Sequence, residues 1–285
     1  MEKKRLYIIA GVTGALGNAL LSKLLQDKNT VVYGISRQAR PWKDFIDSST
    51  GRLYTKTFVC SLGDMEKNTV RGFVRAIDES SFSSIVYVHA LGHFPFETDA
   101  DGMHTVANDI NQDGIDDMTY DLMYTKFTQF MDALRGYHAR THIPVAGTLF
   151  GSIADAHEPK VHQSWWRTMS QVKKYMQHHA SMCGMHITNI SSLLCAREVL
   201  SRPFVFVATD SDPRYWLEPH ELAESLYAQF QSPHYYAGFD ERNVFKHNPS
   251  FKKNYYSCKQ FTKRKVRELY GTTAPNGVNA PSANL

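Results

Sequence analysis

Three glycines spaced three residues apart, directly after a short apolar run, constrain this chain more than any other feature of its sequence. The run at 4–10 suits a buried strand; Gly11, Gly14 and Gly17 follow it, and apolar residues then recur at helical spacing to residue 27. In such a turn one glycine permits the tight bend, one lets the backbone approach a pyrophosphate, and one lets the helix pack on the strand. The pattern therefore predicts a dinucleotide-binding βα unit, with an ordinary βα turn containing incidental glycines as the alternative.

Strands and helices alternate along most of the chain. Expected strands cover 4–10, 30–35, 56–60, 84–89, 142–149 and 185–193, and expected helices cover 14–27, 65–77, 120–134, 165–179 and 218–230. This alternation predicts an α/β fold, a doubly wound parallel sheet (Rossmann-like) with helices on both faces. One domain over residues 1–271 is expected, followed by a flexible tail at 272–285 that is rich in Gly, Pro, Ala, Asn and Ser.

Composition excludes several other classes of protein. The chain is 42% hydrophobic and 21% charged, which is ordinary for a globular protein and excludes a largely disordered chain or a coiled coil. No apolar run reaches the roughly 18 residues that a membrane helix needs. Basic residues at 3–5 before an apolar run imitate a signal peptide, but the glycine spacing favours the dinucleotide turn. We expect a cytoplasmic protein without membrane contact.

Neither disulfides nor metal ions are expected. The chain has four cysteines, Cys60, Cys183, Cys195 and Cys258, which are too scattered for a disulfide framework and form no CxxC pair. Residues 109–114 match the opening of a calcium loop, D-x-N-x-D-G, but Tyr120 stands where the bidentate carboxylate is needed.

The net charge of +4 arises from one segment, because residues 241–270 hold nine Lys and Arg against two Glu. Aromatic residues interleave with these charges, as in a surface for nucleic acid or another anionic partner. A terminal extension that packs its aromatic rings on the domain while its lysines stay in water explains the same pattern, and we favour it. The expected partner is a small-molecule substrate rather than nucleic acid, and a homodimer is an open alternative.

The glycine loop and two later segments resemble the short-chain dehydrogenase/reductase family over about residues 4–230. The loop AGVTGALG at 10–17 is similar to the family's TGxxGxxG loop, in the spacing of its extended and atypical branches. Residues 89–92 (HALG) resemble the stretch that closes the family's fourth strand, and residues 151–154 (GSIA) resemble the segment with its catalytic serine. The resemblance implies a Rossmann fold that binds a nicotinamide dinucleotide.

The resemblance also implies which residues contact the cofactor. They are Gly11, Thr13, Gly14, Ala15, Leu16, Gly17, Ser36, Arg37, Ser61, Leu62, His89, Ala90, Leu91, Lys173 and Ser192. Arg37 follows the second strand, where sites that prefer NAD usually carry an acid, and its guanidinium suits the 2′-phosphate of NADP. NADP is therefore the expected cofactor, with NAD less favoured; the alternative for Arg37 is a solvated loop residue.

The chain departs from the family on its catalytic helix. The family uses a Tyr to move a proton, a Lys four residues later to lower the pKa of that Tyr, and a Ser to polarise the substrate oxygen. Here Ser152 and Lys173 match, but Met169 stands in the place of the Tyr. If Lys174 matches the family's Lys instead, Ser170 stands in the place of the Tyr. The catalytic candidates are Ser152, Lys173, Met169 and Asp121, the last being the nearest match to the family's Asn.

Three hypotheses about function follow. The first, which we favour, is an NADP-dependent oxidoreductase whose proton comes from Ser152, water, Tyr124, His162 or His93. Tyr175 is not a candidate, because it lies two residues after Lys173 and so faces away from it on a helix. The other two are a non-catalytic NADP-binding regulator or scaffold and a non-redox lyase or isomerase on the same fold. From about residue 191 the chain is expected to cover the substrate.

Overall fold

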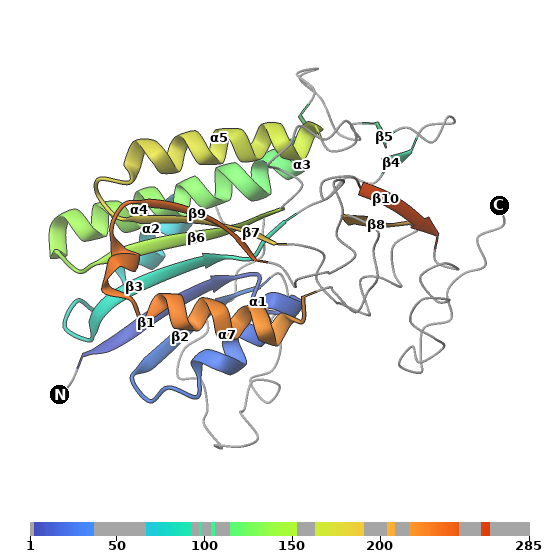
Figure 1. Ribbon diagram of the computed structural model, residues 1–285. Helices are drawn as coiled ribbons and strands as arrows, with labels where there is room; N and C mark the ends of the chain where they lie inside the picture. Colours follow the sequence, from blue (N-terminus) through green and yellow to red (C-terminus); the bar gives the residue numbers. More distant parts are fainter. Residues whose placement is uncertain are drawn as a thin grey trace.

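A computed structural model of the chain describes residues 3–36, 67–92, 97–98, 104–105, 115–152, 163–190, 204–208, 217–244 and 258–262 (Figure 1). Within these ranges a parallel sheet lies between two layers of helices. This confirms the predicted α/β fold with a doubly wound parallel sheet. None of the helices in these ranges is long and apolar enough to cross a membrane.

The described part of the central sheet has six parallel strands in the order β2-β1-β3-β6-β7-β9. The strands are β1 (Lys4–Ala10), β2 (Thr30–Ile35), β3 (Phe82–His89), β6 (Val145–Ser152), β7 (Gly184–Ile190) and β9 (Phe239–Val244). In the register, Ala10 lies between Ile35 and His89. Since β2 and β3 lie on opposite sides of β1, the strand order reverses at β1, and ligands of open α/β sheets bind at such a reversal.

Helices cover both faces of the sheet, as Figure 1 shows. One face carries α1 (Ala15–Leu24) and α7 (Pro219–Phe230), and the other carries α2 (Lys67–Arg75), α4 (Lys126–Thr141) and α5 (Gln163–His179). The remaining short elements are α3 (Asp117–Tyr120), the π-helical turn η3 (Asp121–Thr125), the 3-10 turn η6 (Pro233–Tyr236), and the strand pairs β4 (Glu97–Thr98) with β5 (His104–Thr105) and β8 (Phe204–Ala208) with β10 (Cys258–Thr262).

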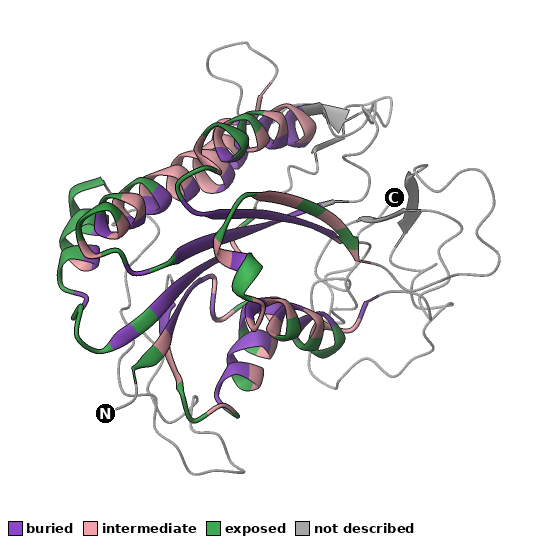
Figure 2. Ribbon diagram, turned by 60° about the vertical axis from the view of Figure 1, so that its left-hand side comes forward, coloured by how far each residue is buried: buried purple, intermediate pink, exposed green. Residues whose placement is uncertain are grey.

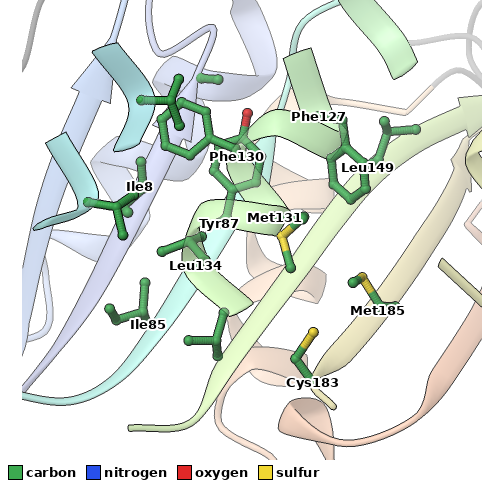
Figure 3. Close-up of a cluster of buried hydrophobic side chains, with 14 of the residues drawn as sticks. Ile8, Ile85, Tyr87, Phe127, Phe130, Met131, Leu134, Leu149, Cys183 and Met185 are labelled. Carbon is green, nitrogen blue, oxygen red and sulfur yellow. The ribbon is translucent and has the colours of Figure 1, made fainter. Parts of the chain in front are cut away.

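The core has two halves, one on each face of the sheet. On β1, Leu6 and Ile8 point toward α2, α4 and α5, whereas Tyr7 and Ile9 point toward α1 and α7, as the two-residue period of a strand requires. Because both faces are covered, the strands inside the sheet are buried over most of their length, whereas edge strand β9 has no buried residue (Figure 2). Figure 3 shows the larger half, in which the Tyr87 ring stacks on Phe130 of α4 with the ring centroids 4.5 Å apart.

Two elements differ from the sequence-based expectation. The expected helix at 120–134 is α3, η3 and α4 in succession, and it extends to Thr141. Strand β9 was not expected, because its sequence FDERNV is charged; in the described sheet it lies at the edge, where charged residues are common. Residues 217–244 complete the core and the sheet through α7 and β9, while the expected strand at 56–60 lies outside the described residues.

Candidate functional site

The turn after β1 lies at the reversal in strand order and is held by both neighbouring strands. The Gly11 N–H donates to the Ile35 carbonyl of β2 at 3.0 Å, and the Ala90 N–H, just after β3, donates to the Ala10 carbonyl at 2.9 Å. The turn therefore has a fixed position at the carboxyl edge of the sheet, where α1 begins.

The three glycines of the turn have three different surroundings. Gly11 adopts a left-handed φ of +86°, and a Cβ there would lie 2.5 Å from the Ala90 carbonyl oxygen. A Cβ on Gly17 would lie 2.2 Å from the Gly11 carbonyl oxygen, so this residue lets α1 pack against the turn. Gly14 is exposed, and among the described residues its Cβ would meet one atom, the Gly11 carbonyl oxygen, in a tight contact at 3.3 Å. The fold thus requires glycine at 11 and 17, whereas a Cβ at Gly14 needs only a small shift of the turn.

The N-terminus of α1 lies at the exposed Gly14. Gly14 is the N-cap residue, no described side chain caps the helix, and the first turn carries no acidic residue. The N–H groups of the first turn have no partner within an α-helix and lie at the positive end of its dipole. Because Leu16 is buried in the core, the turn offers backbone N–H groups rather than side chains to a ligand. This arrangement suits a phosphate or another anion.

The end of β2 is joined to the same turn. The Thr13 and Ser36 hydroxyls lie 3.1 Å apart, within hydrogen-bond distance, and Ser36 is buried. The structure therefore brings together two of the residues expected to contact the cofactor. Four others, Arg37, Ser61, Leu62 and Ser192, lie outside the described residues.

His89, the last residue of β3, directs its imidazole into the core. Its Nε2 lies 2.7 Å from the Leu122 carbonyl and its Nδ1 lies 2.7 Å from the Tyr87 hydroxyl. A carbonyl can only accept, so Nε2 carries the proton and Nδ1 accepts from Tyr87. Burial lowers the pKa of His89 to about 4, which keeps the ring neutral. Both ring nitrogens are occupied, so a cofactor at this strand end would meet backbone and the residues that follow, Ala90 and Leu91.

Met169 lies on the buried face of α5. The side chains of this face, Trp165, Met169, Val172 and Met176, belong to the core, and Met169 is only 5% exposed. Toward the start of the helix, Trp165 approaches the residues that follow β3, because a Cβ on Gly92 would lie 3.7 Å from its ring. The position that the sequence assigned to the family's Tyr is therefore a core position.

Lys173 is directed toward the edge of the described sheet. Its ammonium forms an ion pair with Glu241 of β9, and the Asn189 side-chain amide donates to the other Glu241 oxygen at 3.1 Å. Strands β7 and β6 separate β9 from β3. Lys173 therefore has a defined partner on the far side of β7 from the glycine turn.

The remaining catalytic candidates each have their own surroundings. Ser152 is the last residue of β6, beside Ile190 of β7. Asp121 is the first residue of the π-helical turn η3, and its carboxylate lies 3.8 Å from the Lys126 ammonium. Tyr124, on the same turn, packs against Tyr120 with a ring distance of 4.8 Å. His93 and His162 lie outside the described residues.

Tyr175 faces away from Lys173, as the helical spacing predicts. Its hydroxyl donates to the Asp132 carboxylate of α4 at 2.6 Å. Burial is the largest cause that raises the pKa of Tyr175 far above its usual range, and the hydrogen bond to the Asp132 carboxylate is the next largest. Its phenol is therefore a poor acid.

The described ranges contain no group of three or more His, Cys, Asp or Glu that could hold a metal ion. The segment at 109–114, which opens like a calcium loop, lies outside them.

Two contacts of this region were not predicted from the sequence. Glu241, the partner of Lys173, belongs to the unexpected strand β9. Gly34 of β2 faces Val12 of the glycine turn; a Cβ on Gly34 would lie 2.8 Å from a Val12 methyl carbon. A signal for the second contact was present, because an isolated glycine within a strand often marks a close approach.

Comparison with solved structures shows the same fold in dehydrogenases and reductases. An alcohol dehydrogenase from the archaeon Thermococcus sibiricus, complexed with 5-hydroxy-NADP, is 13% identical with a TM-score of 0.63 and covers 88% of this chain and 100% of its own. A serine dehydrogenase from Escherichia coli is 10% identical with a TM-score of 0.60 and covers 87% and 100%. A 3-oxoacyl-[acyl-carrier protein] reductase from Brucella melitensis with bound NAD is 14% identical with a TM-score of 0.63 and covers 85% and 90%.

Sequence comparison adds nothing to these likenesses. No protein-family model matches the chain, and no curated protein sequence matches it. At identities of 10 to 14%, the likeness to the three solved structures establishes a shared fold.

Proposed function

We propose that the protein binds NADP(H) on the turn at 11–17 and is an oxidoreductase of the short-chain dehydrogenase/reductase type that works without the family's tyrosine. The observation that carries the proposal is the difference in surroundings among the three glycines. Gly11 and Gly17 are enclosed by backbone atoms, whereas Gly14 is exposed at a helix N-terminus that no described side chain caps. A turn built only for packing has no need of an exposed glycine at this point.

The residues of the turn fit a dinucleotide in a specific arrangement. Backbone N–H groups at 15–17 would hold the pyrophosphate, because the Gly14 N–H already donates to the Gly11 carbonyl at 2.9 Å. The end of β2 with Ser36 and Arg37 would hold the adenosine ribose and its 2′-phosphate. Ala90 and Leu91 would border the second ribose at the end of β3. The proposal draws support from the shared fold of an alcohol dehydrogenase complexed with 5-hydroxy-NADP and a reductase with bound NAD. When bound, the nicotinamide supplies or accepts a hydride.

The proton for such a reaction would not come from the usual helix positions. Met169 has no transferable proton and is buried, and the Lys173 ammonium is engaged with Glu241. Tyr175 is held by Asp132 with a raised pKa. We propose Ser152, at the end of β6, or a water molecule beside it, as the proton source, with Tyr124, His93 and His162 as the alternatives.

One specific observation favours a second function, a non-catalytic protein that binds NADP(H) as a regulator or scaffold. The two helix positions that resemble the family's catalytic pair, Met169 and Lys173, contribute to the core and to an ion pair with β9. A binding protein requires the glycine turn and neither of these groups at a reacting atom.

The experiment that tests the proposal has two stages. Calorimetric titration of the full chain with NADPH tests cofactor binding, with Gly14→Val as the non-binding control. We expect the unmodified protein to give a heat of binding and the variant to give none. The loss of NADPH absorbance is then followed with a panel of ketones, aldehydes, imines and enones. Turnover above the rate without protein supports the oxidoreductase, whereas binding without turnover across the panel favours the regulator. Absence of binding would reject both.

A further inference from the structure

Gly34 interrupts strand β2 at a point where the strand meets the glycine turn. The strand reads TVVYGI, and Gly34 shares a face with Val32, which packs in the α1 and α7 half of the core. A Cβ on Gly34 would lie 2.8 Å from Val12 Cγ1, 3.2 Å from Val12 Cβ and 3.2 Å from Val12 Cγ2. All three nearest atoms belong to Val12, so that side chain occupies the space that Gly34 leaves free.

Three consecutive residues of the turn each contact the end of β2. The Gly11 N–H donates to the Ile35 carbonyl at 3.0 Å, and the Val12 N–H approaches the same oxygen at 3.3 Å. The Thr13 hydroxyl lies 3.1 Å from that of Ser36. Val12 itself is only 2% exposed. The first half of the turn is thus fixed to β2 by backbone, by packing and by a hydroxyl pair.

We propose that Gly34 is a positioning residue for the dinucleotide turn. The Val12 side chain, seated over Gly34, sets the distance between the turn and β2, and this distance aims the N–H groups at the start of α1. Gly34 does not touch the dinucleotide in this arrangement; it acts through Val12. The inference rests on the proposed function for its ligand, whereas the packing of Val12 on Gly34 is independent of any ligand.

An added methyl group at 34 must displace the turn, because Val12 has little freedom to turn aside. A β-branched side chain has few rotamers, and this one is enclosed in the core. A shift of a few tenths of an ångström or more would weaken hydrogen bonds from the turn to a phosphate. Loss of one hydrogen bond to a charged group corresponds to about a tenfold or greater loss of affinity.

The test compares four proteins: the unmodified chain, Gly34→Ala, Val12→Ala, and the double variant. Dissociation constants for NADPH are measured by calorimetry, and unfolding midpoints are measured by circular dichroism. We expect Gly34→Ala to weaken NADPH binding about tenfold or more. The double variant should recover most of that affinity, because Val12→Ala removes both methyl carbons and leaves only the Cβ.

Gly147→Ala is the matched control for a purely structural effect. It lies on β6 in the same sheet, and its Cβ would meet the Met131 sulfur at 2.3 Å, on the face opposite the turn. It should lower the unfolding midpoint and leave the NADPH dissociation constant unchanged. If Gly34→Ala behaves like this control, or if the double variant regains no affinity, the positioning role is wrong.

The design separates this inference from the proposed function. If the unmodified protein binds no NADPH, the proposed function fails. The contact between Val12 and Gly34 is then tested by the unfolding midpoints of the four proteins. A double variant that is more stable than the sum of its single effects supports the contact as the determinant of the turn's position. Additive effects overturn it.

Discussion

Lys173 of α5 forms an ion pair with Glu241 of the edge strand β9. The sequence alone assigned this lysine to the cofactor's ribose, by analogy with the lysine that follows the family's tyrosine. In the structure the ammonium is directed away from β3 and the glycine turn, and Asn189 supports the Glu241 carboxylate from the other side. The pair joins the α5 layer to the last strand of the described sheet.

We therefore expect Lys173→Met to leave NADPH affinity unchanged. The lost ion pair should lower the free energy of unfolding by at most about 1 kcal/mol, because Lys173 is 43% exposed and solvent screens the charges. Glu241→Gln is the matched variant and should give a loss of similar size. Calorimetry and urea unfolding measure the two effects. A tenfold weaker NADPH affinity in Lys173→Met alone would return this lysine to the cofactor site.

Replacing Met169 by the family's tyrosine should not create a working site. The position is buried in the core, so the larger side chain should overpack it and lower the free energy of unfolding by about 1–3 kcal/mol. Reduction of a carbonyl panel should stay at the level of the unmodified protein. New activity in Met169→Tyr, with stability retained, would show that this position borders the reacting groups.

Gly14→Val and Gly17→Val should separate ligand binding from folding. Gly14 is exposed and its Cβ would meet one described atom, at 3.3 Å, so the valine should abolish NADPH binding by filling the place of the pyrophosphate while circular dichroism changes little. At Gly17 the added Cβ meets backbone at 2.2 Å, and about 3 kcal/mol or more of stability should be lost. Normal NADPH binding by a folded Gly14→Val protein would mean that the turn serves packing only.

Cofactor preference should depend on Arg37. A guanidinium paired with the 2′-phosphate contributes about 1.5–3 kcal/mol, which corresponds to about 10- to 100-fold tighter binding of NADPH than of NADH. Arg37→Asp should remove or reverse this preference, while Arg37→Lys should retain part of it. The measurement is a titration with each cofactor. Equal affinities in the unmodified protein would contradict the assignment.

Stability should fall in mild acid because of His89. Burial lowers its pKa to about 4 in the folded protein, while the unfolded chain titrates near 6.5. The unfolded state therefore takes up the proton first; His89 favours folding fully above pH 6.5 and progressively less as the pH falls toward 4. The loss should reach about 3 kcal/mol. Buried His186, whose pKa is also lowered, acts in the same direction.

Urea unfolding across this pH range measures the effect of His89. His89→Gln cannot titrate and should flatten the dependence relative to the unmodified protein, while the slope from carboxylates and from His186 remains. Identical pH slopes in the two proteins would mean that His89 carries no part of the acid sensitivity.

The sequence by itself determined the parallel sheet and the place of its glycine turn. Apolar runs at 4–10 and 30–35 coincide with β1 and β2, because strands buried on both faces are apolar over most of their length. The glycines could be assigned because only glycine fits the close backbone contacts at Gly11 and Gly17, and glycine readily adopts the left-handed φ of Gly11.

Only the tertiary structure decided which side chains meet. Met169 and Lys173 stand at a spacing that resembles a catalytic pair, but the packing of α5 buries one and directs the other to Glu241, sixty-eight residues later. The sequence of strand β9 is too charged to be recognised as a strand by itself. It joins the sheet by pairing with β7. Local periodicity fixes the face of an element, whereas its partners depend on contacts between segments far apart in the chain.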